Sequence, residues 1–270
     1  MRQPQGSHTW PDPAVKISRP KRMQRAVNTP VYSVVIPCYN EGDNIETLII
    51  EVETALAPRA EFEIIVVDDC STDHTSARLQ ALRQSREGSL RVLRHRQNSG
   101  QSAGLCTGAD AARGRWLITL DGDGQNDPAD IPHLLAVAEG MPHAVSPLII
   151  CGHRTTRRDT WLRRLSSRVA NAVRGSILND GTPDTGCGLK VLPSATFRAL
   201  PRFDHMHRFL PALVRRLGGT AVSVPVNHRP RLHGRSKYGM WNRLGVGVVD
   251  LWGVSWLIQR RLNPSGSEEI

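Results

Sequence analysis

The 270-residue sequence has few of the features that mark redox, zinc-binding or membrane-spanning chains. Its five cysteines stand at positions 38, 70, 106, 151 and 187, and no two of them form a CxxC pair. Zinc ribbons and dithiol motifs are therefore excluded, and the scattered odd set favours reduced thiols in a cytoplasmic protein. The N-terminus shows no apolar signal-peptide core. No stretch reaches the roughly 18 uncharged apolar residues of a spanning helix.

Aromatic residues are also scarce, at 5% of the chain, whereas basic residues are in excess. The formal net charge is +10 and the sequence pI is about 10.1. This balance favours polyanionic partners, although the same charge can serve solubility alone. Few aromatics leave few platforms for base stacking, and no RNP, KH or zinc-finger pattern occurs. We therefore expect a lipid surface or a phosphate-bearing substrate, and no nucleic acid.

Short apolar runs alternate with helical patterns from Val31 onwards. This alternation predicts an α/β fold with a mostly parallel sheet flanked by helices. Strands are predicted at 32–40, 61–69, 89–95, 116–123, 148–154 and 221–230, with a further strand after the loop that begins at 184. Helices are predicted at 43–56, 76–86, 102–114, 159–178 and 207–218. A basic, glycine-containing loop is predicted at 231–239.

Acidic groups follow three of these strands, in the segments PCYNEGDN, DDCSTD and DGDGQNDP. Ligands of open parallel sheets bind at the carboxyl ends of the strands. Asp121 and Asp123 would face opposite ways in an extended chain. The glycines between and after them permit a turn that brings both carboxylates to one cation. Two carboxylates with phosphate oxygens suit Mg²⁺ or Mn²⁺, and Gln125 adds a neutral oxygen.

The alternative for these acids is a polar turn that caps a helix. We favour that interpretation for Asp127, which precedes Pro128 at the first helical position. After the second strand, we expect Asp69 or Ser71 to cap the next helix while Asp68 binds ligand.

The segments VVIPCYNEGDNI, IIVVDDCSTD and DGDGQNDP together resemble the signatures of glycosyltransferase family 2, whose members have a GT-A nucleotide-sugar domain. Later segments resemble the dolichyl-phosphate mannosyltransferase-like branch, which transfers sugars to polyprenyl phosphates. The resemblance covers about residues 31–240.

This resemblance implies that the nucleoside lies against the ends of the first two strands, with Asp68 contacting base or ribose. The matching positions are Pro37, Tyr39, Glu41, Val66 and Asp68.

The resemblance assigns the metal and the donor diphosphate to Asp121, Asp123 and Gln125. It places Arg231 and Lys237 over the same diphosphate, where a flexible surface loop is the alternative interpretation.

The acceptor phosphate is assigned by the same resemblance to Arg154, Arg163 and Ser167. Because Arg163 and Ser167 are four residues apart, they share a helix face and can meet one phosphate, although an ordinary solvated basic face has the same pattern. Asp184, in DTGCG, is either a general base or a turn residue. The implied catalytic set is Asp121, Asp123, Arg154 and Asp184.

His205 and His207 are two residues apart and would not share a helix face, so we reject a zinc site there. With Arg208 they are expected to have a packing or lid role.

The predicted activity is transfer of a hexose from a nucleotide-diphosphate sugar, of the GDP-mannose or UDP-glucose type, to a polyprenyl phosphate with inversion. A phosphate acceptor is largely dianionic at neutral pH and needs no general base. The alternative is transfer to a hydroxyl of a polysaccharide or lipid headgroup, with Asp184 as the base.

The predicted domain organisation is a disordered basic arm at 1–30, a GT-A catalytic domain at 31–240, an amphipathic membrane-interface helix at 241–262 and a tail at 263–270. Trp252, Trp256 and Leu251 are expected on the apolar face of that helix, which either lies in the membrane interface or packs on the domain. Related enzymes carry spanning helices after the catalytic domain. We expect a peripheral protein on the cytoplasmic face, which a small membrane-protein partner could assist.

Overall fold

The computed structural model describes residues 29–59, 61–86, 88–141, 147–155, 174–178, 180–231 and 240–260. The predicted basic arm, except its last two residues, and the tail lie outside the described residues. So do most of the predicted helix at 159–178, with Arg163 and Ser167, and the loop residue Lys237.

The strands are β1 (Tyr32–Cys38), β2 (Phe62–Asp68), β3 (Leu90–Arg94), β4 (Trp116–Thr119), β5 (Leu148–Arg154), β6 (Lys190–Pro193) and β7 (Thr220–Val226). The helices are α1 (Ile45–Leu56), α2 (Thr75–Ser85), α3 (Gln101–Ala111), α4 (Ile131–Gly140), α6 (Ser194–Arg198), α7 (Leu210–Arg216) and α8 (Met240–Gln259), with 3₁₀ turns η1 (Pro128–Asp130) and η2 (Met206–Arg208). The α/β prediction is confirmed.

The strands form one sheet in the order β3-β2-β1-β4-β6-β5-β7. Among the described strands, β6 alone is antiparallel to its neighbours. The carboxyl ends of β1, β2, β4 and β5 therefore meet at one edge of the sheet, and β6 begins at that edge with Lys190.

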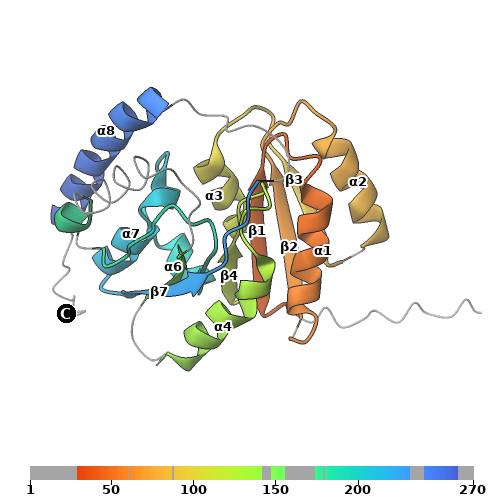
Figure 1. The fold of residues 1–270 in the computed structure, drawn as a ribbon, viewed down its shortest axis with the longest axis horizontal. Coiled ribbons are helices and arrows are strands. Elements are labelled where there is room, and N and C mark those ends of the chain that lie inside the picture. Colours follow the sequence, from red (N-terminus) through yellow and green to blue (C-terminus); the bar gives the residue numbers. More distant parts are fainter. Residues whose placement is uncertain are drawn as a thin grey trace, which may run out of the picture.

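Helices cover the sheet on both faces, which explains the near-continuous apolar runs of β1 and β2 (Figure 1). One hydrophobic core lies beneath α1, α2 and α4, and contains Ile36 and Val66. A second core lies beneath α3, α6, α7 and α8, and contains Val35 and Leu117. Alternate residues of β1 thus enter opposite cores.

The C-terminal helix α8 packs on the second core through one face and exposes the other. Leu251, Val254 and Leu257 contact the core, whereas Val249, Trp252 and Trp256 are exposed by 71%, 75% and 61%. The two interpretations of this helix are therefore not exclusive. The expectation that Leu251 shares the face of the two tryptophans is wrong, because Leu251 lies on the packed face. No helix among the described residues has the length and apolar character needed to cross a bilayer.

Helix α3 approaches β1 closely because two of its residues have no side chain. A Cβ at Gly104 would lie 2.8 Å from Pro37 Cβ, and one at Gly108 would collide with the Val35 side chain. Because these glycines are four residues apart, they form one smooth stripe against the strand. The close approach fixes the position of the first helical residue, Gln101, at the edge where the strands end.

We predict that Gly108→Ala pushes α3 away from β1 and lowers the free energy of unfolding by about 1–2 kcal/mol, because overpacking exceeds the gain in helix propensity. Gly140→Ala is the matched control, because a Cβ there has no neighbour within 4 Å. It should be neutral or stabilise by up to about 1 kcal/mol. Urea unfolding of both variants measures the difference, and equal stabilities would contradict the close-packing argument.

Candidate active site

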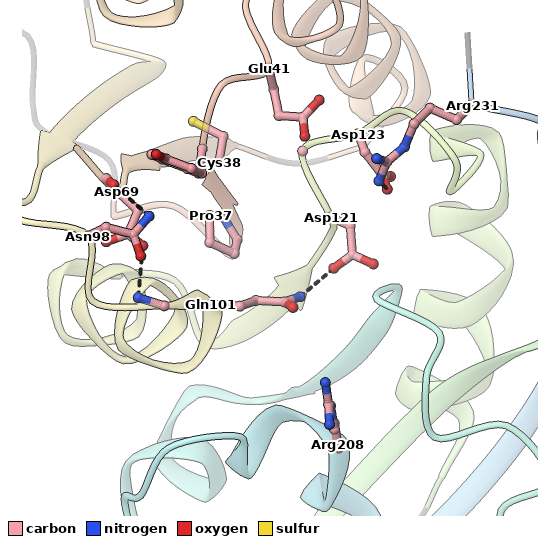
Figure 2. Close-up of a pocket in the computed structure, with 13 residues that line it drawn as sticks. Pro37, Cys38, Glu41, Asp69, Asn98, Gln101, Asp121, Asp123, Arg208 and Arg231 are labelled. Atoms are coloured by element: carbon pink, nitrogen blue, oxygen red, sulfur yellow. Dashed lines mark hydrogen bonds and ion pairs between the residues drawn. The ribbon is translucent and has the colours of Figure 1, made fainter. Parts of the chain in front are cut away.

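Two adjoining cavities lie at the edge where the strands end. The first, of about 240 Å³ and here called the Asp69 cavity, is lined by the ends of β1 and β4, by Asp69 and by the start of α3. The second, of about 530 Å³ and here called the Arg154 cavity, is lined by the ends of β4 and β5, the loop at 184–188, Lys190 and η2. Gln101, Asp121 and Arg208 line both cavities, so these three side chains mark their junction (Figure 2).

Asp121 is the carboxylate at this junction. Its Oδ1 accepts a hydrogen bond of 2.6 Å from Gln101 Nε2, as Figure 2 shows. Burial and the neighbouring Asp123 raise its pKa to about 6, although Lys190, Arg154 and Gln101 act in the opposite direction. On its other side a Cβ at Gly188 would collide with the carboxyl group. Glycine at 188 is therefore required for Asp121 to occupy this position.

Asp123 lies beside Asp121 and is held by a cation and a backbone amide. It forms an ion pair with Arg231, and its Oδ1 accepts a hydrogen bond of 3.1 Å from the Gln125 amide. Arg231 therefore lies beside the carboxylate pair, and its expected contact with the donor diphosphate stays a prediction. Gln125 contributes its backbone here and lines neither cavity.

The two carboxylates fit a divalent cation that protein and substrate hold together. In the part of the chain that the structure describes, no group of three or more His, Cys, Asp or Glu side chains could hold a metal by itself. An ion at this place would take Asp121 and Asp123 as hard oxygen ligands and complete its shell with phosphate oxygens and water, as Mg²⁺ commonly does. Burial is the main cause of the raised pKa of Asp121 and Asp123 adds to it, so a cation held by both carboxylates would favour their charged forms.

The two aspartates at the end of β2 have other surroundings than expected. Asp68 is buried, and its carboxylate accepts hydrogen bonds from the Ser71 amide at 2.9 Å and from the Ser76 hydroxyl. Asp69 lines the cavity and accepts hydrogen bonds of 2.8 Å from both Ser99 N and Gly100 N, at the start of α3. Asp68 is thus committed to local structure, and Asp69 is the residue that faces the cavity.

The expected cap of α2 is wrong as well. Asp73 accepts a hydrogen bond of 2.9 Å from the Thr75 amide at the start of that helix, whereas Asp69 serves α3 and Ser71 Oγ accepts from the Asn40 amide. The prediction for Asp127 is confirmed, because its side chain accepts a hydrogen bond from Ala129 N at 3.0 Å.

Of the other positions expected to contact the nucleoside, Pro37, Tyr39 and Glu41 line the Asp69 cavity. Val66 does not, because its side chain is fully buried in the core beneath α1. Asn98 lines the cavity and was not found from the sequence. It lies in a loop of no regular pattern, so nothing in the sequence marks it.

Arg154 and Asp184 form a bidentate pair in the second cavity. Arg154 Nε lies 2.7 Å from Asp184 Oδ2, and Nη2 lies 2.8 Å from Oδ1. Burial lowers the pKa of Arg154, but the Asp184 carboxylate more than offsets this, so the net shift is upward. Asp184 was expected to be either a general base or a turn residue; the pairing shows a third role, in which its carboxylate holds the arginine at the cavity.

Lys190 is a cavity residue that sequence reasoning missed. Its side chain is buried, and Nζ donates to the carbonyls of Cys187 and Thr185. The ammonium group thereby ties down the loop that carries Gly188 beneath Asp121. The residue lies on an apolar strand, and only the antiparallel direction of β6 brings it to the ligand edge.

Comparison with known proteins identifies the family of this chain. Residues 33–200 match the family model "Glycosyl transferase family 2". The chain is 35% identical over 253 residues to dodecaprenyl-phosphate galacturonate synthase of Rhizobium johnstonii, which covers 89% of this chain and 72% of the relative. It is 34% identical to undecaprenyl-phosphate 4-deoxy-4-formamido-L-arabinose transferase of Edwardsiella ictaluri, over 79% of this chain and 65% of the relative.

Among solved structures, the fold is similar to glucosyl-3-phosphoglycerate synthase of Mycobacterium tuberculosis, crystallised with Mn²⁺, UDP and phosphoglyceric acid. The TM-score is 0.63 at 19% identity, over 87% of this chain and 80% of that one. The sheet and its two helical layers form a fold of the GT-A type. The chain belongs to glycosyl transferase family 2.

We predict that Asp121→Asn stabilises the metal-free protein at pH 7.5 by up to about 3 kcal/mol. The folded pKa of Asp121 lies above its ordinary value of 3.8, near 6. The metal-free native state therefore loses stability as pH rises from about 4 to 6, and the asparagine variant does not. Thermal unfolding at pH 4 and 7.5 tests this. The two proteins should differ at pH 7.5 and agree at pH 4.

Asp43→Asn, at an exposed side chain, is the control. It should change the free energy of unfolding by no more than about 0.5 kcal/mol at either pH. An equal effect of Asp121→Asn at both pH values would contradict the assigned pKa.

Proposed function

We propose that the protein is an inverting glycosyltransferase that moves a hexose from a nucleotide-diphosphate sugar, of the GDP-mannose or UDP-glucose type, to a polyprenyl phosphate with the help of Mg²⁺ or Mn²⁺. The observation that carries the proposal is the Arg154 cavity. It adjoins the carboxylate pair and is lined by three cations, Arg154, Lys190 and Arg208. Such a cavity suits an anionic acceptor. The two relatives named above, which act on polyprenyl phosphates, support the same class of acceptor.

Each cavity has one part in this reaction. The Asp69 cavity receives the nucleoside, against Pro37, Tyr39 and Asp69. Asp121 and Asp123 hold the ion, which when bound neutralises charge on the leaving diphosphate. The acceptor phosphate enters from the Arg154 cavity, where Arg154 is kept in position by Asp184. A phosphate dianion needs no proton removed, so catalysis consists of positioning and electrostatic stabilisation.

The pairing of Asp184 also separates this proposal from the alternative, transfer to a hydroxyl. A hydroxyl acceptor requires a general base within hydrogen-bond reach, and Asp184 was the candidate. In the structure both of its carboxylate oxygens accept hydrogen bonds from Arg154. A carboxylate engaged in this way is a poor base, which favours the phosphate acceptor.

We predict that Asp184→Asn leaves measurable transfer to undecaprenyl phosphate, reduced by about 10- to 100-fold because Arg154 loses its orienting charge. Asp121→Asn should remove Mn²⁺-dependent activity altogether. The assay follows label from UDP-glucose and GDP-mannose into the lipid fraction and determines the anomeric configuration of the product.

Loss of all transfer in Asp184→Asn, together with transfer by the wild type to a hydroxyl acceptor, would favour the alternative. A product with retained configuration would contradict inversion.

We further propose that residues 31–240 form the catalytic domain and that α8 attaches it peripherally to the cytoplasmic face of a membrane. Val249, Trp252 and Trp256 recur at three- and four-residue spacing on its exposed face, and Arg260 follows in the next turn. Exposed tryptophans beside basic residues suit the interface of an anionic bilayer. All five cysteines are free thiols, which supports a reducing compartment. The alternative partner for the exposed face of α8 is a small membrane protein.

We predict that Trp252→Ser with Trp256→Ser weakens binding to phosphatidylglycerol vesicles by about tenfold or more, because the buried apolar area is lost. Ile50→Ser, which removes an exposed apolar residue of α1, is the control and should bind as the wild type does. Cosedimentation measures both. Failure of the wild type to bind vesicles would favour the membrane-protein partner instead.

A further inference from the structure

Arg208 occupies a particular place in the site. It is one of three residues that line both cavities, and the other two, Gln101 and Asp121, are hydrogen bonded to each other. In Figure 2 the Arg208 side chain extends toward the hydrogen-bonded pair of Gln101 and Asp121. A group at this point faces the place where a donor bound in one cavity would meet an acceptor bound in the other.

The other cations of the two cavities are already engaged by protein groups. Arg154 is paired with Asp184 and Arg231 with Asp123, and the Lys190 ammonium group donates to backbone carbonyls. Within the described ranges, the Arg208 side chain has no hydrogen bond and no ion pair, and its backbone amide alone is bonded. A half-buried guanidinium without a carboxylate partner has all five of its donors available to an anion.

The turn that carries Arg208 is fixed on three sides. His205, with φ of 63°, lies 2.9 Å from the Asp250 carboxylate of α8 through Nδ1. Met206 is buried in the second core. His207 Nδ1 lies 2.8 Å from Ser102 Oγ of α3. The arginine is therefore presented by a supported backbone, which reduces the entropy lost when it binds a ligand.

His207 is uncharged and adds no positive charge to this part of the cavity. Burial, and to a lesser degree the nearby Arg208 and Lys190, lower its pKa to about 3, so the ring is neutral at physiological pH. Its role is to anchor the turn to α3, and the cationic charge at the junction comes from Arg208.

We propose that Arg208 is a catalytic residue that binds the attacking phosphate of the acceptor at the junction of the two cavities. This inference rests on the proposed function and adds a residue to it. A phosphate oxygen of the acceptor forms the new bond to the anomeric carbon, and the bond from that carbon to the donor diphosphate breaks. The nucleoside diphosphate leaves with the electron pair, and no proton moves. The bidentate guanidinium orients the acceptor phosphate for in-line attack.

The experiment compares Arg208→Met, which removes the charge, with Arg208→Lys, which keeps it as a single point. Arg202→Met is the control, because Arg202 lies on the same segment but pairs with Asp110 at the surface and lines neither cavity. Calorimetry uses two probes separately: UDP or GDP with Mn²⁺ for the donor side, and geranyl phosphate, added to the nucleotide complex, for the acceptor side. Transfer to undecaprenyl phosphate is measured in parallel.

We expect Arg208→Met to bind nucleotide within about threefold of the wild type, to bind geranyl phosphate about tenfold or more weakly, and to lose about 100-fold in kcat. Arg208→Lys should recover part of both losses, and Arg202→Met should match the wild type. The assignment is overturned if Arg208→Met binds geranyl phosphate as the wild type does, or if nucleotide affinity falls by the same factor. A wild-type protein that binds nucleotide but no geranyl phosphate would instead overturn the proposed acceptor, and the role of Arg208 with it.

Discussion

The site depends on the burial of a carboxylate, Asp121, that the fold holds beside a second one, Asp123, at the end of a buried strand. Asp121 and Asp123 lie just beyond the end of β4, and burial, together with the charge of Asp123, raises the pKa of Asp121 to about 6. The neighbouring groups then have a common purpose. Gln101 donates a hydrogen bond to Asp121, Lys190 and Arg154 act to lower the pKa of Asp121, and Arg231 pairs with Asp123. A divalent ion bound here would add positive charge and so favour the ionised form of both carboxylates.

The cationic side chains at this edge of the sheet have two kinds of role. Some maintain the structure of the site, and one is left to bind a ligand. Lys190 holds the loop bearing Gly188, and Arg154 is oriented by Asp184. Lys190 and Arg154 both contribute positive potential to the cavity while they remain bonded to their protein partners. Arg208 differs, because its turn is anchored to α3 and α8 while its side chain is not paired. This division of labour suits a reaction in which both substrates carry phosphate and no proton has to be moved.

Much of this could be predicted from the sequence, and the failures have physical reasons. The alternation of apolar runs and helical patterns gave the sheet, and the positions of the acidic segments gave its ligand edge. Asp68 and Asp69 were interchanged because side chains at adjacent strand positions face opposite sides, and a sequence does not show which residue leaves the sheet first. Lys190 reaches the site only because β6 is antiparallel. Arg208 is brought there by tertiary packing of a short turn, for which no periodic pattern exists.

The ion pair between Arg231 and Asp123 has a consequence for the order in which the reactants assemble. Asp123 would help to hold a divalent ion, and in this structure its carboxylate is paired with Arg231, so the ion and the guanidinium group would compete for it. A donor bound beside Asp123 would offer Arg231 phosphate oxygens in place of the carboxylate, and Asp121 and Asp123 would then be available to hold a divalent ion. Binding of the ion and binding of the donor would then be thermodynamically linked. An ion that bound without the donor would have to break the ion pair between Arg231 and Asp123, and Arg231 would gain no phosphate in return. The enzyme would thus admit metal and nucleotide as one complex more readily than in succession.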